Sequence, residues 1–124
     1  MDLLEIYADE NGETHFRKAS VEFEANHYAP PSPPLEISAE SPATTSLFLV
    51  APPGWDDAFH ATPRRQYAIL LEGEFSVTAS DGERVMMKPG DMVLLNDAGS
   101  KGHLSRVQGD QPARFLMVGC PADI

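Results

Sequence analysis

The sequence is poor in cysteine, in basic residues and in long apolar runs, and each shortage narrows the class of protein. Cys120 is the only cysteine in 124 residues, so no internal disulfide can form, and a cytoplasmic location is expected. Nine Lys and Arg against 19 Asp and Glu give a formal net charge of -10, which argues against nucleic acid or a membrane surface as partner. No apolar run approaches the length of a membrane span, and residues 1–7 lack the basic-then-apolar pattern of a signal peptide.

A sustained 3.6-residue apolar period is also missing, and short apolar runs separated by turn residues take its place. An Asn11-Gly12 turn predicts a hairpin between residues 3–8 and 14–16, and residues 21–24 alternate as a half-buried strand does. Further strands are predicted at residues 46–50, 66–71, 74–79, 84–87, 92–95, 103–107 and 114–118. Many short strands at regular spacing predict an all-β sandwich or barrel.

Four prolines, Pro30, Pro31, Pro33 and Pro34, interrupt the series of strands. Because proline has no amide to donate to a sheet, this segment is predicted to be an extended arm or linker, and a proline-recognition ligand is the less favoured interpretation. The whole chain, residues 1–124, is expected to be one domain. Residues 1–44 supply N-terminal strands and the proline-rich arm, and residues 45–118 supply the core.

Glycines and histidines in the region 54–103 follow a regular spacing. In the first half, five residues lie between Gly54 and His60, and Thr62 follows His60 by two positions. Three residues then lie between Thr62 and Gln66, and six between Gln66 and Gly73. In the second half, a Pro89-Gly90-Asp91 turn precedes an apolar strand and a later histidine, His103.

This spacing resembles the two motifs of the cupin family, over roughly residues 45–118. The first cupin motif runs glycine, five residues, His-x-His, three residues, Glu, six residues, glycine. The segments Pro63-Arg64-Arg65-Gln66 and Lys101-Gly102-His103 are also similar to a group of uncharacterised bacterial cupin-like proteins. The resemblance implies a double-stranded β-helix, the cupin jelly-roll β-barrel, preceded here by extra N-terminal strands.

Cupins hold a divalent metal with three histidines and one carboxylate, so the resemblance implies that His60, Gln66 and His103 are the candidate metal ligands. The ion would be Fe, Mn, Ni or Zn. Thr62 replaces the second histidine and Gln66 replaces the carboxylate, which weakens metal binding and makes any bound ion a stronger Lewis acid. The alternative is that both histidines are interior residues, hydrogen-bonded to Gln66, Thr62 or Asp97.

Thr62, Arg64 and Arg65 are the candidate ligand-binding residues. The hydroxyl of Thr62 suits a hydrogen bond to a ligand, and the planar guanidinium of arginine recognises a carboxylate or phosphate. A surface salt bridge is the alternative for either arginine. Alternation along a strand allows at most one of the two to face inward. The glycine-rich loop of residues 96–102 makes the spacing from Asp91 to His103 longer than in the common cupin motif. This loop is expected to lie at the barrel mouth and to be able to move over it.

Three functions fit these features. The first is a cupin-fold protein that binds a small acidic or carbonyl-bearing molecule, with or without a weakly held metal. Isomerisation, lyase chemistry and dioxygenation all stay open for it. The second is a metal-free module that binds or senses a small molecule. The third is a structural protein whose pocket is vestigial. A homodimer is expected in all three cases, because the edge strands of a sheet need protection.

Overall fold

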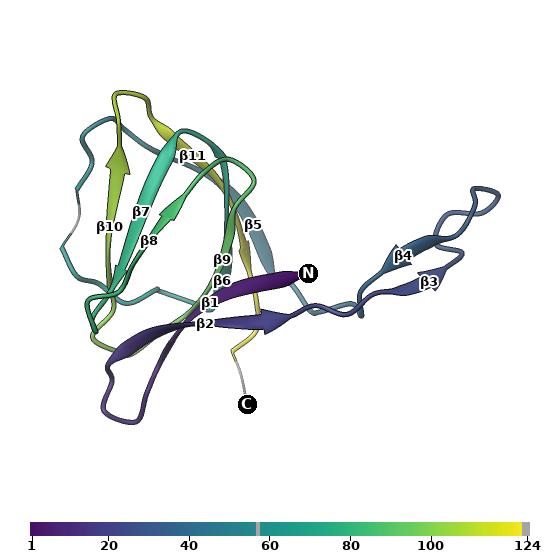
Figure 1. Cartoon of the computed structure of the whole chain (residues 1–124), viewed down its shortest axis with the longest axis horizontal. Coiled ribbons are helices and arrows are strands. Elements are labelled where there is room, and N and C mark those ends of the chain that lie inside the picture. Colours follow the sequence, from purple (N-terminus) through teal and green to yellow (C-terminus); the bar gives the residue numbers. More distant parts are fainter. Residues whose placement is uncertain (57, 123–124) are drawn as a thin grey trace.

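The computed structural model describes residues 1–56 and 58–122, and all of its regular elements are strands (Figure 1). They are β1 Asp2–Ala8, β2 Thr14–Ser20, β3 Glu24–Asn26, β4 Leu35–Ile37, β5 Thr45–Ala51, β6 Gln66–Glu72, β7 Glu74–Ala79, β8 Arg84–Met87, β9 Met92–Asn96, β10 His103–Gln108 and β11 Ala113–Gly119. The part of the chain that the structure describes contains no helix, and so none that could cross a membrane. The predicted all-β fold is confirmed.

Two sheets enclose the core of the barrel. A six-stranded sheet has the order β2-β1-β9-β6-β11-β5, and a three-stranded sheet has the order β10-β7-β8. Strand β1 runs parallel to β9, whereas the other paired strands are antiparallel. Ile6 and Leu70 from the first sheet and Met87 from the second are at most 2% exposed and belong to one apolar cluster. Burial of this cluster is the main force that holds the sheets together.

The chain passes from one sheet to the other at Gly73, the single residue between β6 and β7. Its φ is 87°, in the left-handed region that favours glycine, and a Cβ there would collide with the carbonyl oxygen of Pro112. The last glycine of the predicted motif is therefore required by the backbone rather than by any ligand.

Strands β3 and β4 lie outside the barrel, in an arm formed by residues 21–44 (Figure 1). The two strands pair with each other as a two-stranded sheet, and the four prolines lie in the turn between them. The proline-rich segment expected to be an arm or linker lies within this hairpin, and the strand expected at residues 21–24 begins only at Glu24. The arm leaves β2 at one edge of the six-stranded sheet and returns to β5 at the opposite edge.

Candidate functional site

A cavity of about 340 Å³ lies inside the barrel and is lined by both sheets. Most of its wall is apolar. Its polar side chains are His60, Thr62, Gln66, His103 and Ser105. The motif positions singled out by spacing, from His60 through Gln66 to His103, are therefore brought to one cavity. Ser105 carries no signal in the motif, but it follows His103 by two residues on β10 and so faces the same side.

His60 and His103 are held together by their backbones. The His60 N–H donates to the His103 carbonyl at 3.0 Å, and the His103 N–H donates to the His60 carbonyl at 2.9 Å. Their rings lie with centroids 4.8 Å apart. Gly102 permits this approach, because a Cβ at that position would collide with the His60 backbone. The separation of the two rings thus follows from main-chain pairing, before any ligand is bound.

Asp97 orients the His103 ring. Its Oδ2 lies 2.6 Å from His103 Nδ1, and its Oδ1 accepts a hydrogen bond from the Thr62 N–H at 3.3 Å. Asp97 is fully buried and His103 is 3% exposed. A carboxylate at Nδ1 selects the tautomer with a proton there, which leaves a lone pair on Nε2 of the neutral ring. The hydrogen bond between His103 and Asp97 is one of those expected for an interior histidine.

The loop of residues 97–102 is anchored to the hairpin formed by β1 and β2. The Lys101 N–H donates to the Gly12 carbonyl at 3.0 Å, and Lys101 Nζ lies 2.7 Å from Glu13 Oε2. Thr14 Oγ1 donates to the Gly102 carbonyl at 2.8 Å. The ion pair raises the pKa of Lys101 and lowers that of Glu13. These contacts hold the loop in the position that directs His103 into the barrel.

Thr62 and Gln66 form a second polar pair in the cavity wall. Gln66 Nε2 donates to Thr62 Oγ1 at 3.2 Å, and Thr62 Oγ1 donates to the Arg64 carbonyl at 2.6 Å. Thr62 is 4% exposed and Gln66 is 9% exposed. Gln66 is the first residue of β6 and is paired with Leu95 of β9, so its side chain points inward.

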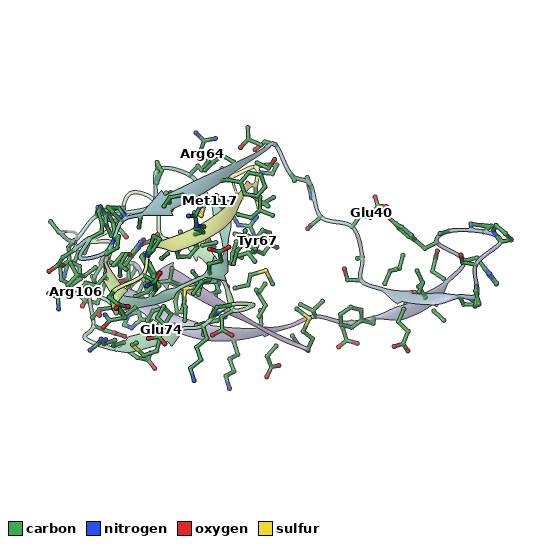
Figure 2. All side chains as sticks on the ribbon, turned by 90° about the horizontal axis from the view of Figure 1, so that it is seen from above. Glu40, Arg64, Tyr67, Glu74, Arg106 and Met117 are labelled. Atoms are coloured by element: carbon green, nitrogen blue, oxygen red, sulfur yellow. The ribbon has the colours of Figure 1, made fainter. Side chains whose placement is uncertain are left out.

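Arg64 and Arg65 do not line the cavity. Arg64 is exposed and donates from Nη1 to Thr45 Oγ1 at 3.2 Å (Figure 2). Arg65 is half-buried, and its charge lowers the pKa of Glu5, on β1. Neither arginine faces the cavity, which agrees with the expectation that at most one does. The reason differs from the one expected, because the two lie in a bend before β6, where the two-residue period of a strand does not apply.

Aromatic side chains form one wall of the cavity. The Trp55 and Phe75 rings stack with centroids 6.2 Å apart, and Phe75 meets Phe115 edge to face at 4.8 Å. All three line the cavity, whereas Phe59 is 51% exposed and Tyr67 lies on the opposite face of the sheet. A flat apolar wall of this kind favours a ligand with an apolar body.

Residues 47–119, from β5 to the end of β11, match the family model described as the cupin domain. The chain belongs to the cupin family. This cupin is also similar to the solved structure of a putative ethanolamine utilization protein Q from Salmonella typhimurium LT2. The identity is 22%, the match covers 99% of this chain and 98% of that chain, and the TM-score is 0.46. No curated protein matches the sequence.

The donor set is small for a cupin metal site. Within residues 1–56 and 58–122, no three His, Cys, Asp or Glu side chains are grouped so that they could hold a metal ion. His60 and His103 are the two imidazoles, and Gln66 offers an amide oxygen. The Asp97 carboxylate is directed to Nδ1 of His103 and away from the cavity wall. Two imidazoles and an amide suit weak, open coordination rather than a tightly held ion.

The polar end of the cavity can hydrogen-bond an oxygen and exchange a proton. An imidazole oriented by a buried carboxylate is a general base in its neutral form and a donor from Nε2 in its protonated form. No Lys or Arg is present in the lining formed by the described residues. Any charge on a ligand must therefore be balanced by the histidines themselves.

Proposed function

We propose that this cupin binds a small molecule with an apolar body and one carbonyl or carboxylate oxygen, and that the oxygen lies against His60 and His103. The division of the cavity into an apolar wall and one polar end is the observation that carries the proposal. Its volume of about 340 Å³ lies near the lower end of the range typical of ligand cavities, about 300–1,000 Å³.

Recognition of the oxygen depends on His103 in this proposal. A ketone or aldehyde oxygen accepts a hydrogen bond, and a carboxylate additionally gains from the charge of a protonated ring. Because Asp97 is hydrogen-bonded to the same ring, the imidazolium would keep a balancing carboxylate behind it. Thr62, Gln66 and Ser105 supply further hydrogen-bonding atoms around the ligand.

Thermal-shift and calorimetric titrations with small branched or aromatic carboxylates, their methyl ketones and the matching hydrocarbons test this function. The acids and ketones should stabilise the protein more than the hydrocarbons do. His103→Ala should weaken their binding by about tenfold or more, since a hydrogen bond that involves a charged group contributes about 1.5–3 kcal/mol. His27→Ala, an exposed histidine in the arm, is the matched control and should bind as the wild type does. Equal binding to His103→Ala and His27→Ala would refute the assignment.

A weakly held divalent metal is the second candidate, and the Asp97–His103 hydrogen bond favours it. Metal-binding histidines usually donate their other N–H to a carboxylate or carbonyl. His60, His103 and Gln66 would hold the ion, which would act as a Lewis acid toward the ligand oxygen.

Elemental analysis of protein purified without chelators tests the metal separately. Added Mn, Fe, Ni or Zn should raise the melting temperature of the wild type and of His27→Ala, but not of His60→Ala or His103→Ala. A metal-free protein that gains no stability from any of the four ions rules out this candidate and leaves the first one standing. Failure of both titrations would leave a structural protein with an unused pocket.

A further inference from the structure

Over β5, β6 and β11 the outer face of the six-stranded sheet is mostly apolar, whereas over β1, β2 and β9 the same face carries Glu5, Arg17 and Asn96. Strand β6 alternates between inward residues that are buried and outward residues that are half-buried or exposed. The registers place the following outward residues together: Tyr67, Ile69 and Leu71 of β6, Leu116 and Val118 of β11, and Phe48 of β5. An antiparallel sheet with one face in water normally carries polar residues on that face. This pattern is instead that of a sheet covered on both sides.

Strand β5 is an unprotected edge. It pairs with β11 on one side only, and its sequence, TSLFLVA, contains neither a charged residue nor proline. Leu47 is 49% exposed, Phe48 78%, Leu49 40% and Val50 54%. Proteins usually protect such edges with charges, prolines or a covering segment, because an exposed apolar strand pairs with other chains.

The arm of residues 21–44 is exposed in the same way. Its side chains from residue 22 to residue 36 are all exposed, and they include Phe23 at 44%, Tyr28 at 63% and Leu35 at 50%. Figure 2 shows the arm extending well beyond the barrel. Only its base lies near the sheet, where Val21 and Glu40 line a hollow together with Tyr67. A two-stranded hairpin on its own is only marginally stable in water, so this arm needs a surface on which to pack.

Charge distinguishes the arm from the surface near β5. The arm carries four glutamates, Glu22, Glu24, Glu36 and Glu40, and no Lys or Arg. Arg64 is exposed and hydrogen-bonded to Thr45, the first residue of β5. An acidic arm is therefore complementary to the end of β5 at which Arg64 lies.

We infer that a second copy of this chain covers the outer face, and that the arm of each copy lies across β5 of the other, with its glutamates toward Arg64. The exposed arm and the exposed edge belong to the same chain, so one two-fold contact covers both on each copy. A stable interface uses roughly 20–30 residues from each side. Residues 21–44 and the outward positions of β5, β6 and β11 together supply a number of this order.

The second copy would also complete the cavity. Leu49 and Val50 of β5 line the cavity and are 40% and 54% exposed, so this side of the wall is in contact with solvent in a single chain. An arm laid over β5 excludes water from that side. The inference does not depend on which molecule the cavity holds.

Multi-angle light scattering and sedimentation velocity on the full chain test the dimer. The wild type should have twice the mass of one chain, and Phe48→Glu should raise the dissociation constant by about tenfold or more, because it places a charge in an apolar interface. Phe48 is 78% exposed in one chain, so this change leaves the barrel core intact. Met86→Glu, a 48% exposed apolar residue on β8 of the other sheet, is the matched control and should remain dimeric. A monomeric wild type, or a Phe48→Glu variant as dimeric as Met86→Glu, overturns the inference.

Cross-linking between chains tests the exchange of arms. Glu36→Cys and Ser46→Cys are made separately in a Cys120→Ser background, which removes the chain's only cysteine. When the two proteins are mixed and treated with a short bismaleimide, a heterodimer should form in higher yield than either homodimer. A further variant carries both cysteines in one chain. If that variant cross-links only within itself, or if the mixed proteins form no cross-link, each arm does not lie on the other copy.

Discussion

Glu5 shows how single residues of the β1–β2 hairpin stabilise the barrel. Its carboxylate is 6% exposed and accepts hydrogen bonds from Arg17 Nε and Asn96 Nδ2, both at 2.8 Å. Burial raises the pKa of this group, but the two hydrogen bonds and the charges of Arg17 and Arg65 outweigh it and leave the pKa lowered. Glu5 therefore connects the hairpin to Asn96, the residue next to Asp97.

His15 gives the hairpin a dependence on pH. Its ring nitrogens lie 2.8 Å from Asp9 Oδ2 and 2.8 Å from Asp81 Oδ2, and these hydrogen bonds raise the pKa of His15 above its ordinary 6.5. A raised pKa in the folded state means that the stabilisation is complete below pH 6.5 and is lost as the pH rises through the folded value. His15→Gln should therefore lower the free energy of unfolding at pH 5.5 and have little effect at pH 9.

Urea unfolding at the two pH values measures this effect. His27→Gln replaces an exposed histidine of the arm and should show no such difference between pH values. A loss of stability of the same size at pH 9 for His15→Gln would mean that the contribution of His15 is packing, including its contact with the Tyr7 ring at 5.7 Å, rather than charge.

At the scale of elements, the polar end of the cavity depends on one short loop and one pair of backbone hydrogen bonds. The segment before β10 is anchored to the β1–β2 hairpin, and Gly102 lets His60 approach His103. The three parts come from distant regions of the sequence, so the site forms only when the barrel closes.

Gly102→Ala should disrupt this closure. Gly102 has φ of 80°, and an added Cβ would also collide with the His60 backbone, so we expect a loss of about 2–4 kcal/mol in the free energy of unfolding. Gly99→Ala is the matched control, since Gly99 has φ of 72° but open space around it, and should cost about 1 kcal/mol. Chemical denaturation measures both values. Equal losses would show that backbone strain alone, without the contact to His60, explains the need for glycine.

Much of the barrel could be predicted from sequence because its strands are short, alternate in polarity and end at turn residues. The strands predicted from residue 46 onward each overlap an observed strand. The spacing of His60, Thr62, Gln66 and His103 likewise anticipated that they meet. Prediction was weaker where local pattern does not decide the structure: the inward or outward direction of Arg64 and Arg65 depends on a bend, and the pairing of β3 with β4 depends on where the arm turns.

The role of Asp97 could be predicted only as one of several hydrogen-bonding options for a histidine. Its distance from His103 is set by the loop between them, whose shape depends on anchoring to Gly12 and Thr14 of a distant hairpin. Long-range contacts of this kind leave no periodic signal in a single sequence.

At the scale of the whole molecule, the arm and the outer face of the sheet favour a two-chain assembly whose stability depends on concentration. Mass action stabilises a folded dimer over unfolded monomers, so the melting temperature should rise as the protein concentration is increased. Calorimetry at several concentrations measures the slope. Phe48→Glu should show a weaker dependence and Met86→Glu an unchanged one; a concentration-independent wild type contradicts the dimer.

The arm also determines how the chain is connected, because it is the covalent link between β2 and β5. A single cut within residues 21–44 would turn the protein into two pieces, with the N-terminal piece held by the parallel ladder of β1 on β9 and by the fully buried side chain of Ile6. A synthetic peptide covering residues 1–20 should therefore assemble with the remainder of the chain. Isotopes, fluorophores or unnatural amino acids could then be introduced beside the cavity by chemical synthesis of a segment that contains none of the cavity-lining residues.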